Sequence, residues 1–222
     1  MIRPAAVAVV GLLFSAGAAA AQSDAGVAIG VNAGTPGLGV DAQIRLGQIF
    51  VLRGGVERLE HDFDETYQDV TYSGRLGFDT VSGFVDVHPL ANGFLISGGA
   101  YVGDRSIGLD ARPSAPVEIG GATFTPAQVG TLTGEIKLKD VAPFVGLGFD
   151  DTFTRAGRWG FRAVAGVAWS EAPEVGLSSS GGTLSNDANF RARLAEEARE
   201  IQSDAEDYGL FPVLQIGLNY RF

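Results

Sequence analysis

The chain has 222 residues, enough for one domain of moderate size or two very small ones. Its 26 acidic and 16 basic residues give a net charge of −10, which argues against nucleic-acid binding because phosphate affinity comes from clustered lysine and arginine. The absence of cysteine excludes disulfides, thiolate metal sites and cysteine nucleophiles, and a hydrophobic content of 45% is too high for a disordered chain.

The first 21 residues have the pattern of a secretory signal peptide. Arg3 supplies the positive start, residues 5–14 form a short apolar stretch, and three alanines at 19–21 provide a cleavage site. We therefore expect residues 1–21 to be removed and residues 22–222 to form the exported protein. Beyond residue 21 no apolar run approaches the ~18 residues that a membrane-spanning helix needs.

The exported part alternates apolar and polar or small residues with a period of two. The alternation is clearest over 38–47, 159–170 and 214–222. Such a period marks β-strands with one apolar face and one polar or small face. Eight strands are predicted, at 25–33, 38–47, 49–59, 70–88, 94–111, 134–150, 158–170 and 211–222.

The predicted links fall into two groups. Those near 47–48, 90–93 and 154–158 are short, whereas those at 60–69, 112–133 and 171–210 are long, with 34–37 the one short link among them. An even strand number, short turns on one side and long loops on the other are typical of outer-membrane barrels. A soluble sandwich uses the same alternation, but with its apolar faces turned inward.

Two further features favour the barrel over the sandwich. Trp159 and Trp169 are ten residues apart on one face, which places them roughly 24 Å apart along the membrane normal at the usual strand tilt. Charged residues recur on the small face, where a barrel has its lumen: Asp41, Arg45, Arg75, Arg162 and Arg221. The predicted fold is all-β, an eight-stranded antiparallel transmembrane β-barrel.

The parity of the apolar residues switches inside two strands, near 78–81 and near 102–107. These strands are predicted to pair as one long hairpin. Either matching bulges or a hairpin whose upper half rises above the membrane would produce the switch.

Residues 186–208 break the period of two and show apolar spacings of three and four, which predicts an amphipathic helix. Asn186 or Asp187 is a candidate N-cap and Gly209 a candidate end. The helix lies in a loop insertion at 185–209, where its apolar stripe covers either the barrel mouth or its own loop.

The last eight residues resemble the C-terminal assembly signal of outer-membrane barrels. The signal has a polar residue, a glycine two positions on, and aromatics at the antepenultimate and last positions, matched here by Gln215, Gly217, Tyr220 and Phe222. With the segments at 86–89, 93–94, 97–99, 142–148 and 211–222, most of the chain resembles small proteobacterial outer-membrane barrel proteins. It is also similar in size and strand count to the OmpA-barrel and OmpW types. The resemblance implies a fold, a location and the barrel-assembly machinery with periplasmic chaperones as partners in biogenesis, but little about activity.

Two histidines are candidates for chemistry. His61, beside Asp62 and Asp64 and near Ser73, imitates the histidine, serine and acid used by outer-membrane lipid A acylases and deacylases. Such a site requires the base within hydrogen-bond reach of the hydroxyl, and no motif surrounds these residues, so a solvated loop histidine is the favoured interpretation. His88, before a proline at a turn, is expected to be structural.

The acids of the predicted loop at 60–69 number five: Glu60, Asp62, Asp64, Glu65 and Asp69. They offer oxygen ligands for calcium or magnesium, but their spacing does not match an EF-hand, so a solvated loop is favoured and no metal or cofactor is expected.

The lumenal charges, with Glu135 or Lys137, are expected to form an internal ion-pair network that fills an eight-stranded barrel. Glycines at predicted lumenal positions leave a narrow passage as the alternative: Gly39, Gly47, Gly99, Gly160, Gly166 and Gly217.

Three functions follow from these observations. The first is a non-enzymatic barrel with a structural or surface role, in contact with outer-membrane lipid and lipopolysaccharide. The second is a narrow conduit for small or apolar solutes, gated by the 186–208 helix. The third is a lipid A-modifying enzyme at the outer rim. The sequence shows neither the solute nor the oligomeric state.

Overall fold

The computed structural model describes residues 26–67, 70–170, 173–205 and 209–222, so the expected signal peptide lies outside the described residues. Within these ranges no helix is both long and apolar enough to cross a membrane. The elements in chain order are β1 (Val27–Gly34), β2 (Gly37–Leu46), β3 (Phe50–Tyr67), β4 (Val70–Val87), β5 (Phe94–Arg112), β6 (Val117–Ile119), β7 (Ala122–Phe124), α2 (Pro126–Val129), β8 (Gly130–Leu138), β9 (Val141–Asp150), β10 (Trp159–Trp169), β11 (Glu174–Gly181), α3 (Ala188–Ala205) and β12 (Leu210–Arg221).

Eight of these strands pair in a ring. Neighbours run in the order β5-β4-β3-β2-β1-β12-β10-β9, and β9 pairs in turn with β5. Every pair is antiparallel, and the first and last strands meet in the register Ala28 to Arg221. The prediction of an all-β antiparallel fold with eight ring strands and one helix is therefore confirmed at this level.

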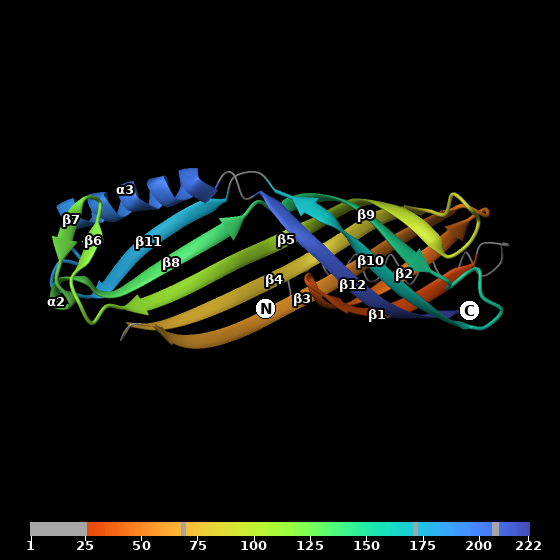
Figure 1. Ribbon diagram of the computed structural model, residues 1–222, viewed down its shortest axis with the longest axis horizontal. Helices are drawn as coiled ribbons and strands as arrows, with labels where there is room; N and C mark the ends of the chain where they lie inside the picture. The colour runs from red at the N-terminus through yellow and green to blue at the C-terminus, as the bar shows by residue number, and fades with distance from the viewer. Residues whose placement is uncertain (1–25, 68–69, 171–172, 206–208) are drawn as a thin grey trace.

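Strands β3, β4 and β5 are about twice as long as β1 and β2, and their outer halves leave the ring (Figure 1). β3 pairs with β2 only as far as Arg58, and β5 changes partner from β9 at Val102 to β8 at Arg105. We call the resulting five-stranded extension the arm: residues 59–67, 70–79 and 103–112 together with β8 and β11. The ring end that carries the arm is called the mouth.

The hairpins carry no bulge. The register of β3 with β4 runs without interruption from Phe50 opposite Val87 to Tyr67 opposite Val70, and that of β4 with β5 from Thr71 to Val87. Of the two interpretations of the parity switch, the structure has the hairpin that rises beyond the ring. Along the ring, apolar residues point away from the lumen. Along the arm, they lie on the face that continues the lumenal face, so the parity switch marks the level at which the ring ends.

Three predicted segments differ from the structure. The strand expected at 134–150 is two strands, because β8 turns at residues 139–140 into β9. Residues 60–67 of the loop expected at 60–69 continue β3, and the long link 171–210 contains β11 as well as the helix. The first error joins an arm strand to a ring strand, and the other two place arm strands in loops.

Helix α3 begins after Asp187, whose side chain accepts a hydrogen bond from the backbone N–H of Phe190 at 2.9 Å, as an N-cap does. Its expected end at Gly209 falls beside residues 206–208, outside the described residues. The helix packs on β11 and β6, and its buried Phe190 and Leu194 join Ile119 and Val129 in a second apolar core at the tip of the arm. It therefore lies along the arm, in contact with its own loop, as one of the two interpretations had it.

Candidate functional site

The interior of the ring holds a fully buried ion pair. Arg162 on β10 donates hydrogen bonds to both carboxylate oxygens of Asp41 on β2, at 3.0 and 2.5 Å, and both side chains are at most 1% exposed. Asn32 also donates to Asp41 at 2.8 Å, and Gln215 donates to Asn32 at 3.1 Å. Four strands are thus tied together across the lumen, because burial of a charge is tolerated only with such partners.

A second buried pair joins β3 and β4. The Arg53 guanidinium contacts the Asp86 carboxylate at 2.8 Å, and Ser97 lies within hydrogen-bond distance of both side chains. The guanidinium also lies 4.1 Å from the centre of the Phe84 ring, a cation–π contact. Glu57 lies on the same face of β3 as Arg53, four residues nearer the mouth, and accepts a hydrogen bond from Ser82 at 2.7 Å.

The end of the lumen away from the mouth is polar as well. Gln43 donates to Asp150 at 3.1 Å, and Asn219 donates to the Thr152 hydroxyl at 2.7 Å. All four side chains are buried. The polar network therefore extends from this end to the middle of the ring.

Neighbouring side chains occupy the space beside the lumenal glycines. A Cβ atom at Gly39 would lie 2.8 Å from the Asn32 amide oxygen, and one at Gly217 would lie 3.2 Å from the Arg162 guanidinium. A Cβ at Gly166 would lie 2.7 Å from the Phe144 ring. These glycines make room for long side chains rather than for a passage. Gly47 is in the β2–β3 turn, not the lumen, with a φ of +70° that favours glycine.

An aromatic layer lies beside the Arg53–Asp86 pair, on the mouth side of the Arg162–Asp41 pair. Phe84, Tyr101 and Phe144 contact one another edge to face, with ring centres 5.1 to 5.9 Å apart. They belong to one buried apolar cluster with Leu95, Ala142, Val164, Ala168 and Val213. The mouth side of the lumen therefore combines this apolar cluster with the buried polar side chains of Glu57 and Thr80.

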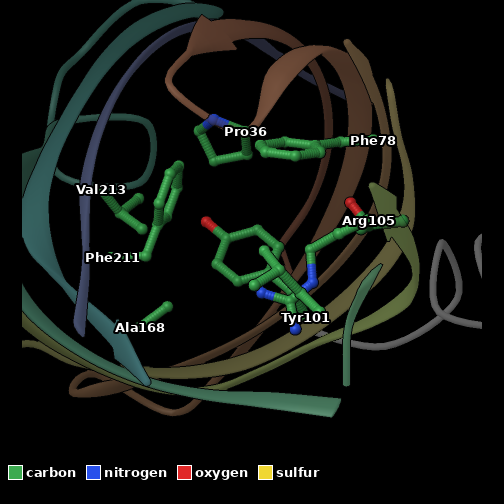
Figure 2. A pocket seen from close by; sticks show the side chains of 9 residues that line it. Pro36, Phe78, Tyr101, Arg105, Ala168, Phe211 and Val213 are labelled. Carbon is green, nitrogen blue, oxygen red and sulfur yellow. The ribbon is translucent and has the colours of Figure 1, made fainter. Parts of the chain in front are cut away.

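A cavity of about 20 Å³ lies at the mouth, above this layer (Figure 2). Pro36, Phe78, Tyr101, Arg105, Phe211 and Val213 line it, with Thr80, Leu138 and Ala168. This volume holds about one water.

The outer face of the ring is apolar and exposed. Leu147 and Val145 on β9 are 55% and 51% exposed, and Leu38 on β2 is 71% exposed. Aromatic side chains gather at the end away from the mouth, on strand ends or turns: Phe50, Phe94, Phe149, Trp159 and Phe222. Trp169 stands at the other end of β10, 42% exposed. The ring is thus inverted relative to a soluble protein, with charges inside and large apolar side chains outside.

The predicted lumenal charges separate into three groups. Asp41 and Arg162 lie inside the ring as described. Arg45 and Arg221 lie at the end away from the mouth, where they donate to the backbone carbonyls of Gly47 and Gly157 at 2.8 and 3.0 Å.

The prediction that Arg75 lies in the lumen is wrong. Arg75 lies on the polar face of the arm, outside the lumen. Its side chain is 75% exposed and forms an ion pair with Asp62 at 3.0 Å. Glu135 and Lys137 are likewise exposed on β8 and pair with each other at 3.2 Å. All three residues were assigned to the lumen from the alternation of faces along the ring strands, and that assignment does not apply to the arm.

The residues of the expected assembly signal divide between the two faces of β12. Gln215 and Gly217 are buried on the lumenal face, whereas Tyr220 packs outward against Trp159 and Phe222, with ring centres 5.2 and 5.4 Å apart. The terminal aromatics therefore join the aromatic group at that end of the ring.

The structure does not bring His61 and Ser73 together. His61 is opposite Leu76 in the β3–β4 pair and Ser73 is opposite Asp64, three positions away. Directly opposed residues share a face and successive residues alternate, so His61 and Ser73 point to opposite faces of the arm. His88 is buried at the β4–β5 turn, where its Nδ1 lies 2.9 Å from the Asn92 carbonyl oxygen.

Four of the five acids expected in one loop, those at 60, 62, 64 and 65, lie along the exposed edge strand β3, and the fifth lies outside the described residues. Glu60 pairs with Arg58 at 3.1 Å and Asp62 with Arg75. The side chains of Glu65 and Asp69 lie outside the described residues. Within the part of the chain that is described, no cluster of three or more His, Cys, Asp or Glu side chains is arranged for a metal ion.

Sequence reasoning missed most of the polar network, including Gln43, Arg53, Glu57, Asp86 and Ser97. The signal was present, because Gln43 lies between Asp41 and Arg45 on one face, and Arg53 and Glu57 share a parity. Extending the parity argument strand by strand would have found them.

Comparison with known proteins identifies solved structures of the same fold. The crystal structure of Acinetobacter baumannii CarO2 matches with a TM-score of 0.63 and 22% identity, over 90% of this chain and 100% of that chain. The crystal structure of A. baumannii CarO matches with a TM-score of 0.61 and 22% identity, over 88% of this chain and 97% of that one. No family model and no curated protein matches the sequence. At this identity the likeness shows a shared fold.

Proposed function

We propose that the protein is an integral outer-membrane β-barrel with a structural or surface role and no catalytic activity. The inverted ring carries this proposal. A protein in water does not surround a fully buried Arg162–Asp41 pair with a band of exposed leucine, isoleucine, valine and phenylalanine. In a bilayer the same arrangement is favourable, because lipid covers the apolar band and the strands satisfy one another's backbone groups.

The height of the band fits a bilayer. Trp159 and Trp169 end the outward face of β10, roughly 24 Å apart along the normal at a usual strand tilt, close to the ~25 Å apolar band of such barrels. In this orientation the arm and α3 project to the outside, and both chain ends face the periplasm.

The filled lumen favours a structural or surface role over a conduit. The buried polar network and the aromatic layer together occupy the interior of the ring, and an eight-stranded barrel has room for little beyond its side chains. Gating by the helix finds no support in the geometry, because α3 packs on β11 and β6 along the arm.

The remaining parts of the proposal follow from location. The proposal includes export by the signal peptide and a location in a Gram-negative envelope. It also includes assembly by the barrel machinery with periplasmic chaperones, and contact with lipopolysaccharide. So does the size class of the OmpA-barrel and OmpW types. The fold shared with CarO is compatible with each of these.

The first test is location. The chain with residues 1–21 is expressed in a Gram-negative host, and inner and outer membranes are separated by density. We expect the protein in the outer membrane, resistant to extraction by urea and more mobile on electrophoresis before heating than after. A protein released in soluble form from the periplasm would contradict the proposal.

The second test separates the roles. Planar bilayers containing refolded 22–222 should show no discrete conductance steps, and deletion of 186–208 should leave them silent. Steps in either form would support a conduit. A lipid A mass spectrum changed by the protein, and restored in His61→Ala, would support the enzyme. Loss of the protein should weaken the envelope against detergent.

A further inference from the structure

Arg105 is the buried cation that the polar network leaves out. Its side chain lies where β5 leaves the ring, and the residue is only 7% exposed. One guanidinium nitrogen donates to the Lys139 carbonyl, but the Nε–H is buried without an acceptor. Within the described ranges Arg105 forms no ion pair, whereas Arg53 and Arg162 each have a carboxylate. The exposed Asp140 of the β8–β9 turn acts on it electrostatically without an ion pair. A buried charge with no directly bonded anion is costly, so this position favours one.

Arg105 lines the mouth cavity together with aromatic side chains. Phe78 and Phe211 form one wall, with ring centres 5.9 Å apart, and Tyr101 lies beside them on the same strand as Arg105. Figure 2 shows the Tyr101 ring between the Arg105 guanidinium and Phe211, with its hydroxyl directed towards the side of the mouth formed by Phe211 and Val213. The Arg105 guanidinium and the hydroxyls of Tyr101 and Thr80 are therefore the polar groups of an otherwise apolar cavity, which is the usual composition of a small-molecule site.

An apolar strip leads from the cavity along the arm. Phe78, Arg105 and Leu138 are neighbours on β4, β5 and β8, and the next residues on the same face are Leu76, Ile107 and Ile136. Farther out on this face Leu109 is 41% exposed and Phe63 is 37% exposed. Helix α3 covers the β11 side of the arm, so the strip on β3, β4 and β5 remains open.

We infer that the mouth binds a small amphipathic carboxylate, with the acid group at Arg105 and Tyr101 and the tail along this strip. The cavity has room for one carboxylate oxygen in place of a water, so the rest of the acid group lies at its opening and the tail meets the apolar residues directly beyond it. A guanidinium and a phenol can both donate to a carboxylate, and the guanidinium repels an ammonium. Glu57 is opposite Thr80, whose hydroxyl lies 3.5 Å from the Glu57 carboxylate, but Glu57 itself does not line the cavity. The inference rests on the mouth and not on the membrane location.

Calorimetry of the protein in lipid nanodiscs tests the inference. Octanoate is titrated against octanamide, which has the same tail and no charge, with empty nanodiscs subtracted to remove partitioning into lipid. We expect saturable binding of octanoate and at least about tenfold weaker binding of octanamide, because a charged hydrogen-bond partner is lost.

Three variants assign the binding to the mouth. Arg105→Gln should weaken octanoate binding at least about tenfold, and Tyr101→Phe should weaken it by a smaller factor. Arg75→Gln is the matched control, because Arg75 lies on the opposite face of the arm. This variant should bind octanoate as the parent protein does. If Arg105→Gln fails to fold, Arg105→Lys takes its place and is compared with Tyr101→Phe.

Equal affinity for octanoate and octanamide would overturn the inference, and so would unchanged octanoate binding in Arg105→Gln and Tyr101→Phe. A second copy of the chain is the other possible occupant of the strip. A dimeric mass in the nanodisc, together with no octanoate binding, would assign the strip to that copy and refute the ligand.

Discussion

Replacing Arg162 by methionine should destabilise the ring strongly. The substitution keeps much of the side-chain volume but removes two hydrogen bonds to Asp41, at 3.0 and 2.5 Å. Asp41 then retains the Asn32 amide at 2.8 Å, and its carboxylate stays buried. A hydrogen bond to a charged group contributes ~1.5–3 kcal/mol, and breaking a buried pair costs ~3–5 kcal/mol. Both routes predict a loss of about 3–5 kcal/mol.

Urea unfolding of the protein in lipid vesicles measures this loss. Trp159 and Trp169 flank Arg162 on β10, so their fluorescence reports on the affected strand. Adding Asp41→Asn to Arg162→Met removes the stranded charge and should restore part of the stability. The control Arg75→Met breaks an exposed pair and should cost less than about 1 kcal/mol.

The reasoning would be refuted if Arg162→Met cost no more than Arg75→Met. It would also be refuted if the two lumenal substitutions were simply additive, because additivity would mean that the side chains do not interact.

Three further predictions concern the arm and the outer face. Phe190→Ala should cost ~3–5 kcal/mol of local stability at the arm tip, seen as faster proteolysis of the arm while the ring keeps its heat-dependent electrophoretic mobility. Leu147→Arg on the outward face of β9 should cost ~2–4 kcal/mol in vesicles, whereas Ser178→Arg on the polar face of the arm should be nearly neutral; equal effects would argue against lipid around the ring. The hydrogen bond from Lys139, at 2.6 Å, lowers the pKa of Glu174 on β11, so this carboxylate should stay ionised to lower pH than usual, and Lys139→Met should return its NMR titration midpoint upwards.

The ring was predictable because its strands follow one rule. Alternation over 38–47 and 159–170 assigns each side chain to a face, and it placed Asp41 and Arg162 on the face where the structure has them. The rule needs no knowledge of which strand pairs with which, so local sequence suffices.

The arm was not predictable because partner choice decides it. β5 pairs with β9 below Val102 and with β8 above Arg105, and nothing local to β5 states where that exchange occurs. Arg75 was misplaced for the same reason, since above the exchange the apolar face changes sides. The mouth cavity likewise depends on residues that are distant in sequence, such as Pro36, Arg105 and Phe211.

The two connections that build the outer part of the arm have a topological property with a practical consequence. One leaves the ring at β5 and returns at β9, and the other leaves at β10 and returns at β12; in each case the two ring strands are neighbours. Strand neighbours lie ~4.8 Å apart, so each insertion begins and ends at almost the same point. The entropy of closing a loop grows slowly, by ~0.6 kcal/mol for each doubling of length. The ring can therefore carry outer segments of very different size and sequence without any change in the pairing of its own eight strands.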